Sequence, residues 1–180
     1  MANRTEIRLT GSGGQGLILA GIILAEAALL DDLNAIQSQS YGPEARGGAS
    51  KAEVIISDEE IFYPKIQNAD LLLCLTRESY CKYIPDLKDD GILIIDSDVS
   101  FDNIETSYKI IQIPVIDTAT HEVGKSMVAN IVALGVIQEA TKVVSKDSLE
   151  KAVLKRVPPG TQELNRLALE EGYKLVSNHK

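Results

Sequence analysis

The stretch Gly11-Ser12-Gly13-Gly14-Gln15-Gly16 decides the opening of the fold, because it lies between a short strand and a long apolar helix. The strand is Glu6-Ile7-Arg8-Leu9, and the helix is expected over about residues 17–30. A strand, a glycine turn and a helix in this order are typical of a doubly wound α/β domain. Glycines permit positive φ angles and leave backbone amides uncovered, next to the positive end of the helix. The stretch therefore predicts an anion-binding loop, or a place where another backbone comes very close.

Two other interpretations of the glycine stretch remain open. Gly11, Gly13 and Gly16 match the dinucleotide fingerprint G-x-G-x-x-G, which also needs an acidic residue about 20 positions further on, at the end of the second strand. The second strand, Ala35-Ile36-Gln37-Ser38-Gln39, ends in amides and hydroxyls instead. The other interpretation is a turn that only joins a strand to a helix.

The alternation of apolar runs predicts the fold class. The 180 residues are expected to form one domain, 1–180, in which 158–180 provides a C-terminal amphipathic helix that packs on the rest. Strands alternate with helices, which predicts an α/β fold with a doubly wound, mostly parallel sheet and helices on both faces, a Rossmann-like three-layer arrangement. Residues 69–76 form a continuous apolar run, typical of a central strand. Residues 87–91 are interpreted as a turn, and a helix is expected over 125–140, with Ser126 as its candidate cap. Asp147 and Glu150, three residues apart, are interpreted as a capping pair of the next helix.

Charge and cysteine content exclude several classes of function. The net charge of −8 disfavours nucleic acid and membrane surfaces as partners. The first residues lack the apolar core of a signal peptide, and the apolar helix over 17–30 is too short to cross a bilayer. Two cysteines, Cys74 and Cys81, make no disulfide framework, and an iron–sulfur cluster takes four thiolates. These features together predict a cytoplasmic protein.

The candidate ligand-binding loops lie where the strands end. In an open α/β sheet the ligand crevice lies at the carboxyl ends of the strands, so loops 11–16 and 39–48 should meet there with the turns after Thr76, Asp96 and Ile116. Arg46 is the cation of the first two loops, and with the amides of residues 13–16 it would clamp a phosphate or a carboxylate. Alternatively, Arg46 pairs with Glu44 or anchors the loop to a partner.

His121 is a weaker candidate. It lies near Asp117 after a predicted strand, which allows an acid–base role, but such a histidine is more often a helix-start residue in contact with solvent. The two histidines of the chain do not make a metal site. The candidate cofactor-binding residues are therefore Gly11, Gly13, Gly14, Gln15, Gly16 and Arg46, and no catalytic residue or metal ligand is assigned.

Two motifs carry a resemblance to a known family. The glycine stretch with its apolar helix, followed by Ser40-Tyr41-Gly42-Pro43-Glu44-Ala45-Arg46-Gly47-Gly48-Ala49-Ser50, resembles the gamma subunit of the 2-oxoacid:ferredoxin oxidoreductases. The likeness continues through Ala69-Asp70, the helix from Met127 to Gly135 and the C-terminal Asn165, Ala168 and Gly172. It covers essentially the whole chain. The form of residues 41–48 is most similar to the 2-oxoglutarate type.

The resemblance implies a reaction and partners. The reaction converts a 2-oxoacid, coenzyme A and oxidised ferredoxin into acyl-CoA, carbon dioxide and reduced ferredoxin. Alpha and beta subunits, with or without a delta subunit, would carry thiamine diphosphate and the iron–sulfur cluster, so this chain would bind neither and would be inactive alone. Ferredoxin would be reached through the complex. The glycine loop and Arg46 would lie near the phosphates of coenzyme A.

The composition of the first helix predicts an interface. Residues 17–30 carry more apolar surface than one sheet face can cover, so we expect self-association or partner binding beside the glycine loop. The rival functions are a stand-alone Rossmann-like dinucleotide-binding oxidoreductase or sensor, and a pure assembly subunit that touches no ligand.

Overall fold

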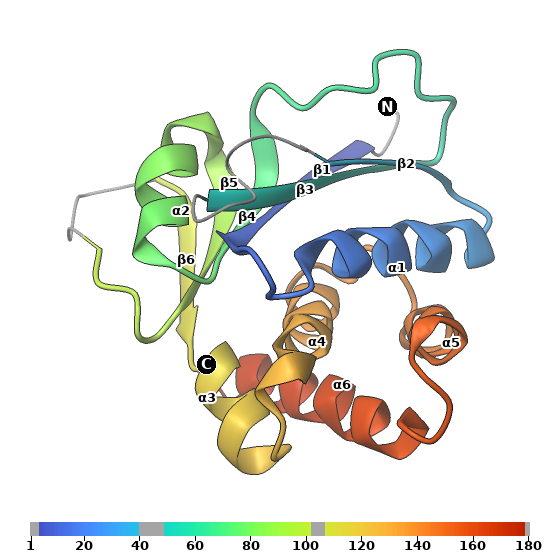
Figure 1. Cartoon of the computed structure of the whole chain (residues 1–180). Coiled ribbons are helices and arrows are strands. Elements are labelled where there is room, and N and C mark those ends of the chain that lie inside the picture. Colours follow the sequence, from blue (N-terminus) through green and yellow to red (C-terminus); the bar gives the residue numbers. More distant parts are fainter. Residues whose placement is uncertain (1–3, 40–48, 102–106, 179–180) are drawn as a thin grey trace.

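The computed structural model describes residues 4–39, 49–101 and 107–178, and its centre is a mixed sheet of six strands (Figure 1). The order of the strands across the sheet is β2-β3-β1-β4-β5-β6. Their bounds are Arg4–Ser12 (β1), Asn34–Gln39 (β2), Ala49–Ser57 (β3), Ala69–Cys74 (β4), Leu87–Asp96 (β5) and Lys109–Ile113 (β6).

The helices comprise six α-helices and three short turns of other type within the described residues. The α-helices are Leu17–Leu30 (α1), Arg77–Tyr83 (α2), Val115–Asp117 (α3), Ala129–Thr141 (α4), Lys146–Arg156 (α5) and Gln162–Ser177 (α6). The short turns are Ile84–Asp86 (η2), Thr118–Glu122 (η3) and Ser126–Val128 (η4).

The two faces of the sheet are covered unequally. Helices α1, α4, α5 and α6 lie on one face, whereas α2 lies on the other (Figure 1). The large core fills the space between the sheet and the four helices, and the strand residues facing it include Ile7, Leu9 and Leu73. A smaller core under α2 contains Leu72, Tyr83 and other side chains of the opposite face. The predicted three-layer α/β class is confirmed.

Strand β3 distinguishes this sheet from an all-parallel one. It runs antiparallel to both of its neighbours, β1 and β2, while β1, β4, β5 and β6 are parallel to one another. The carboxyl ends of β1, β4, β5 and β6 therefore lie at one edge of the sheet. In the register of β1 and β3, Ser12 is opposite Ala49, so the start of β3 lies at that same edge.

Three local predictions were wrong. Residues 87–91 are not a turn, because they form the first half of β5, where Leu87 is opposite Ala69 of β4. Ser126 caps no helix, because the chain forms the short turn η4 before α4 starts, and α4 has no side-chain cap. A capping pair of Asp147 and Glu150 was also expected, but α5 is capped by Ser145, whose side chain accepts from the Ser148 amide.

Two glycines bring α4 and α6 into backbone contact. A Cβ atom placed on Gly172 would lie 2.2 Å from the carbonyl oxygen of Val132 and 3.0 Å from Cα of Gly135. A Cβ atom on Gly135 would lie 2.5 Å from the carbonyl oxygen of Leu169. Because these neighbours are backbone atoms, no side-chain rotation relieves the contact. The two helices can therefore pack at this distance only with glycine at both positions.

We expect Gly172→Ala to destabilise the protein by about 1–3 kcal/mol, the usual range for overpacking. Gly21→Ala is the matched control, because its Cβ would meet only side-chain atoms, the nearest being Cβ of Ala52 at 3.2 Å. Alanine is also the better helix former, so Gly21→Ala should change stability by at most about 1 kcal/mol. Denaturant unfolding of both variants measures the difference, and equal stabilities would contradict the glycine contact.

Asp31 ties the end of α1 to the start of α5. Its carboxylate accepts hydrogen bonds from the backbone N–H of Ser145 at 2.5 Å, from Oγ of Ser145 at 2.7 Å and from Oγ of Ser148 at 2.6 Å. Burial raises the pKa of Asp31, but the hydrogen bonds from Ser148 and Ser145 outweigh it and leave the pKa below its usual value. The charged form is therefore favoured in the folded state.

Asp31→Asn should destabilise the protein by about 1–3 kcal/mol at neutral pH, because charge-assisted hydrogen bonds are lost. Since the folded-state pKa is lowered, the contribution of Asp31 is fully present above its unfolded pKa and disappears as the pH falls through the folded value. The difference in the free energy of unfolding between wild type and Asp31→Asn should thus disappear below about pH 4. The control is Asp147→Asn, whose exposed pair with Lys151 contributes little. A gap independent of pH would refute the ionic role of Asp31.

Candidate functional site

The candidate site is the glycine loop, residues 11–16, between β1 and α1. Gly11 is the buried end of the strand rather than a free loop residue. A Cβ atom there would lie 2.2 Å from Oε1 of Gln15 and 3.1 Å from a methyl carbon of Leu17, so a side chain at residue 11 would displace the Gln15 amide. By contrast, Ser12, Gly13 and Gly14 are exposed.

The loop is partly closed by its own side chain. Oε1 of Gln15 accepts a hydrogen bond from the backbone N–H of Ser12 at 2.8 Å. Gly14 has a φ of 87°, and a Cβ atom on it would have nothing within 4 Å, so its conformation favours glycine while the space beside it is open. Gly16, the N-cap of α1, has a φ of 71°. The first turn of α1 contains no acidic residue, so no carboxylate competes for the start of the helix.

Asn130 of α4 is hydrogen-bonded to the last residue of the glycine loop. This buried side chain at the second position of α4 donates from Nδ2 to the carbonyl oxygen of Gly16 at 3.2 Å. A Cβ atom on Gly16 would lie only 2.6 Å from the same Nδ2. In the sequence, Asn130 is a polar interruption of an otherwise apolar helix. That interruption was the available signal, because a buried amide needs a hydrogen-bond partner.

A shallow groove runs from the loop along α1. It has a volume of about 420 Å³ and is lined by Ser12, Gly14, Gly16, Leu17, Ile18, Leu19, Ile22 and Ser50. Its walls beyond the loop are mainly apolar. The groove therefore joins an exposed glycine loop to an apolar helix surface.

Arg46 lies outside the described residues, and so does most of the loop 39–48. Its place in the chain is nevertheless bracketed by the ends of β2 and β3. Ala49 is opposite Ser12, and Ser50 lines the groove beside the glycine loop. Residue 46 is thus three residues from a position paired with the glycine stretch, and its role remains a prediction.

The other predicted turns also lie at this edge. Thr76 caps α2 with its side chain, and Arg77 donates to the carbonyl and the hydroxyl oxygens of Ser100. Asp96 ends β5 as a buried carboxylate that accepts from the backbone N–H of Ile116 at 2.9 Å and of Asp98 at 3.0 Å. Burial raises its pKa, against the effect of these hydrogen bonds. Asp96 thus holds together the ends of β5 and β6.

His121 is not brought to the glycine loop by the strand order. It lies in η3 after β6, which β4 and β5 separate from β1. Its Nδ1 is 2.7 Å from Oδ1 of Asp117, and both side chains are largely exposed. An exposed pair of this kind offers no enclosed space in which a substrate would be held.

The cysteines and carboxylates offer no metal centre in the described part of the chain. Residues 4–39, 49–101 and 107–178 contain no group of three or more His, Cys, Asp or Glu side chains that could hold a metal ion. Cys74 is buried, and burial raises the pKa of its thiol to about 12. Cys81 is exposed on α2. Within the same residues, no helix is both long and apolar enough to cross a bilayer.

Comparison with known proteins assigns the chain to a family. Residues 6–175 match the family described as pyruvate ferredoxin/flavodoxin oxidoreductase. The chain belongs to this family. It is 51% identical over 176 residues to the 2-oxoglutarate synthase subunit KorC of Methanocaldococcus jannaschii, a match that covers 96% of this chain and 94% of that protein. The KorC subunit of Methanothermobacter marburgensis is 49% identical over 180 residues, covering 96% and 97%.

A solved structure in the family has the same fold. The gamma subunit of a keto/oxoacid ferredoxin oxidoreductase from Geobacter sulfurreducens superposes with a TM-score of 0.91 at 50% identity, covering 99% of each chain. The predicted resemblance to gamma subunits of the 2-oxoacid:ferredoxin oxidoreductases is confirmed, and the chain is a subunit of an oxidoreductase.

Membership of this oxidoreductase family does not favour the dinucleotide alternative, and the sheet gives a physical reason. A dinucleotide site uses the end of the strand next to β1 to hold the ribose. Here the neighbour of β1 on that side is β3, which runs antiparallel and presents its start at the glycine loop. Strand β2 lies one position further away and ends in Ser38 and Gln39.

The contact between Gly16 and Asn130 can be tested by a double-mutant cycle. We expect Gly16→Ala to destabilise the protein by about 2 kcal/mol, because it combines a left-handed backbone with the clash on Nδ2. Asn130→Ala alone should lose about 1 kcal/mol with its hydrogen bond. The double variant should be less destabilised than the sum, because the clashing amide is gone. Denaturant unfolding provides the four values, and strict additivity would rule out the contact.

Proposed function

We propose that this chain is the gamma subunit of a 2-oxoglutarate:ferredoxin oxidoreductase, the enzyme that converts 2-oxoglutarate, coenzyme A and oxidised ferredoxin into succinyl-CoA, carbon dioxide and reduced ferredoxin. The observation that carries the proposal is the identity of about half of all residues, over nearly the full length, with two subunits named for 2-oxoglutarate synthase. The form of residues 41–48 supports the same substrate type.

Thiamine diphosphate and the iron–sulfur cluster belong to partner subunits in this proposal. The chain has two cysteines, fewer than the four thiolates that a cluster takes. Alpha and beta subunits are therefore the proposed partners, with ferredoxin reached through them. Free cysteines support a reducing, cytoplasmic setting.

The glycine loop is the proposed contact with coenzyme A. Its features suit a phosphate: exposed glycines, a helix start without a carboxylate, and Arg46 three residues before Ala49, which pairs with Ser12. The loop would bind and orient the cofactor without taking part in bond making. In this role Gly13, Gly14 and Gly16 supply backbone amides, while Gln15 keeps the loop closed through Ser12.

The outer side of α1 is the proposed contact with a partner subunit or a second copy. Ile18 and Ile22 are half-buried in the groove, and Leu29 and Leu30 at the end of the helix are exposed. These four apolar side chains lie on the part of α1 that the sheet and α4 leave uncovered. Covering them would remove apolar surface from water, which stabilises association.

The coenzyme A contact predicts a specific effect of two glycine variants in the reconstituted enzyme. Gly14→Ala and Gly160→Ala are matched, because both glycines have a φ near 87° and open space around the Cβ position. Both should lower stability by about 1–2 kcal/mol. Only Gly14→Ala should raise KM for coenzyme A, since its methyl group lies where the phosphate would approach. Steady-state kinetics with each substrate varied in turn measures this difference.

Arg46 gives a second arm of the same kinetic experiment. Arg46→Ala should raise KM for coenzyme A about ten- to a hundredfold, and Arg46→Lys should recover only part of it, because a point charge does not replace a bidentate fork. An unchanged KM for coenzyme A in a complex that still assembles would reject the cofactor role of Arg46. A complex that no longer assembles would make Arg46 an interface residue.

A further inference from the structure

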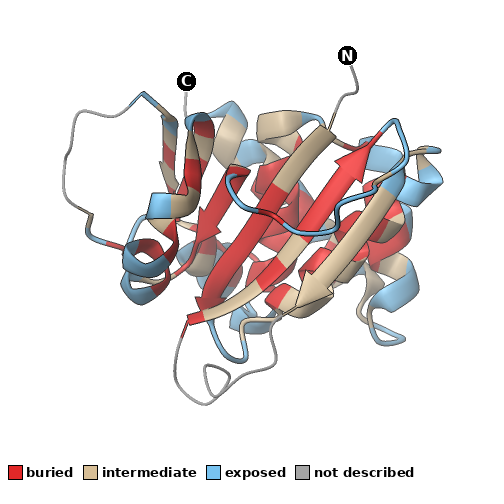
Figure 2. Cartoon of the chain, turned by 90° about the horizontal axis from the view of Figure 1, so that it is seen from above, coloured by how far each residue is buried: buried red, intermediate tan, exposed pale blue. Residues whose placement is uncertain are grey.

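The segment of residues 58–68 presents aromatic side chains to solvent on the face of the sheet opposite α1. This aromatic segment joins β3 to β4 without regular secondary structure and crosses above the sheet as an exposed strip (Figures 1 and 2). Phe62 is 85% exposed and Tyr63 is 53% exposed. Phe62 is one of two phenylalanines in the sequence. Burying a phenylalanine is strongly favourable, so two adjoining exposed aromatic rings point to contact with another molecule.

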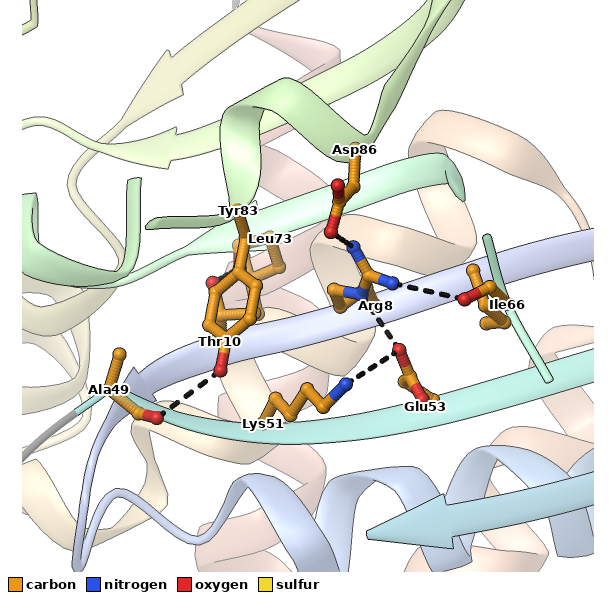
Figure 3. A network of polar contacts seen from close by, with 9 residues as sticks. All are labelled: Arg8, Thr10, Ala49, Lys51, Glu53, Ile66, Leu73, Tyr83 and Asp86. Atoms are coloured by element: carbon orange, nitrogen blue, oxygen red, sulfur yellow. Dashed lines mark hydrogen bonds and ion pairs between the residues drawn. The ribbon is translucent and has the colours of Figure 1, made fainter. Parts of the chain in front are cut away.

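The backbone of the aromatic segment is fixed by two arginines of β1. Arg4 donates to the carbonyl oxygen of Tyr63 at 2.9 Å. Arg8 donates to the carbonyl oxygen of Ile66 at 3.3 Å (Figure 3). Arg8 is itself buried and held by Glu53 at 2.8 Å and Asp86 at 2.7 Å. The two anchors flank the stretch between Tyr63 and Ile66, so the backbone next to the rings is held in place.

The inward side chains of the same segment add a third support. Ile66 is buried against Ile55 of β3 and Ala69 of β4, and Ile61 packs against this small cluster. Phe62 and Tyr63 therefore point outward while the isoleucines on either side of them point inward. Such an arrangement pre-organises the rings, which reduces the entropy lost when they bind.

The surroundings of the rings define the chemistry of the partner. Glu59 and Glu60 are exposed, and neither forms an ion pair with the described part of the chain. On the other side of Tyr63, a recess of about 220 Å³ is lined by Glu6, Tyr63, Lys65, Gln67, Asn68 and Lys88, and Lys88 is paired with Asp70. An apolar centre with a polar rim is the usual anatomy of a protein interface. The acidic part of this rim is complementary to a basic surface.

We propose that the aromatic segment docks into an apolar, lysine- or arginine-rimmed recess of another subunit of the oxidoreductase complex. The identity of the partner as a subunit rests on the proposed function. A second copy of this chain fits poorly, because a two-fold contact would bring Glu59 and Glu60 against the same acids, and each copy carries a net charge of −8. Acidic partners are disfavoured beside Glu59 and Glu60 for the same reason.

The test measures the dissociation constant between this chain, wild type or variant, and its purified partner subunits. Phe62→Ser should weaken assembly at least about tenfold, as expected for an aromatic hot spot. Glu59→Lys combined with Glu60→Lys should also weaken assembly, and it should reduce the dependence of the dissociation constant on salt between about 50 and 300 mM. Leu167→Ser is the matched control, because Leu167 is an apolar side chain 38% exposed on α6, behind the opposite face of the sheet. It should change the constant by less than about twofold.

Thermal unfolding of each isolated variant shows that the fold is retained, since all four positions are exposed. Wild-type affinity in Phe62→Ser, or tighter assembly after charge reversal, would overturn the proposed docking surface. If Phe62→Ser abolishes self-association of the chain but leaves subunit binding intact, the surface is a contact between two copies, and the proposed docking to another subunit is overturned as well. If the wild-type chain assembles with no other subunit, both the proposed function and this inference are overturned. If the wild-type complex assembles and Phe62→Ser leaves its dissociation constant unchanged, only this inference is overturned.

Discussion

Strand β3, hydrogen-bonded in antiparallel direction between β1 and β2, is the constraint on which the candidate site depends. It places the start of β3 opposite the glycine loop, because Ser12 of β1 is paired with Ala49 of β3. It also occupies the position beside β1 that a dinucleotide-binding fold gives to its second parallel strand. One strand direction thus disfavours the dinucleotide alternative and brings Ala49 and Ser50, the last residues of the second sequence motif, to the edge of the glycine loop.

Arg8 shows how the same strand pairing organises the opposite face of the sheet. The guanidinium of this β1 residue pairs with Glu53 of β3 and with Asp86 of η2, and it lies 5.6 Å from the ring centre of Tyr83 (Figure 3). A buried charge needs partners on several sides, since a lost partner leaves an uncompensated charge away from water. The pairing of β1 with β3, the position of α2 and the course of the segment before β4 are therefore linked through one side chain.

The sequence predicted the parts of the structure that local patterns control. The strand, glycine loop and helix at the start, and the buried run of β4, follow from periodicity and from glycine chemistry. The direction of β3 was not predictable, because strand order depends on contacts between distant residues. Asp89-Asp90-Gly91 has turn-like composition, yet it belongs to β5, where both aspartates are exposed. Gly11 looked like a loop residue, but its role in packing against Gln15 emerges only in three dimensions. The exposure of Phe62 and Tyr63 was not predictable either, because a short apolar run does not indicate which of its side chains face solvent.

The connection between β2 and β3 begins and ends on neighbouring strands, because Gln39 at the end of β2 is opposite Ala52 of β3. The entropy of closing such a connection changes only slowly with its length. A change in the length of this connection should therefore change the free energy of folding only slightly through loop-closure entropy. The connection that contains Arg46 can therefore differ in length at little entropic cost to folding.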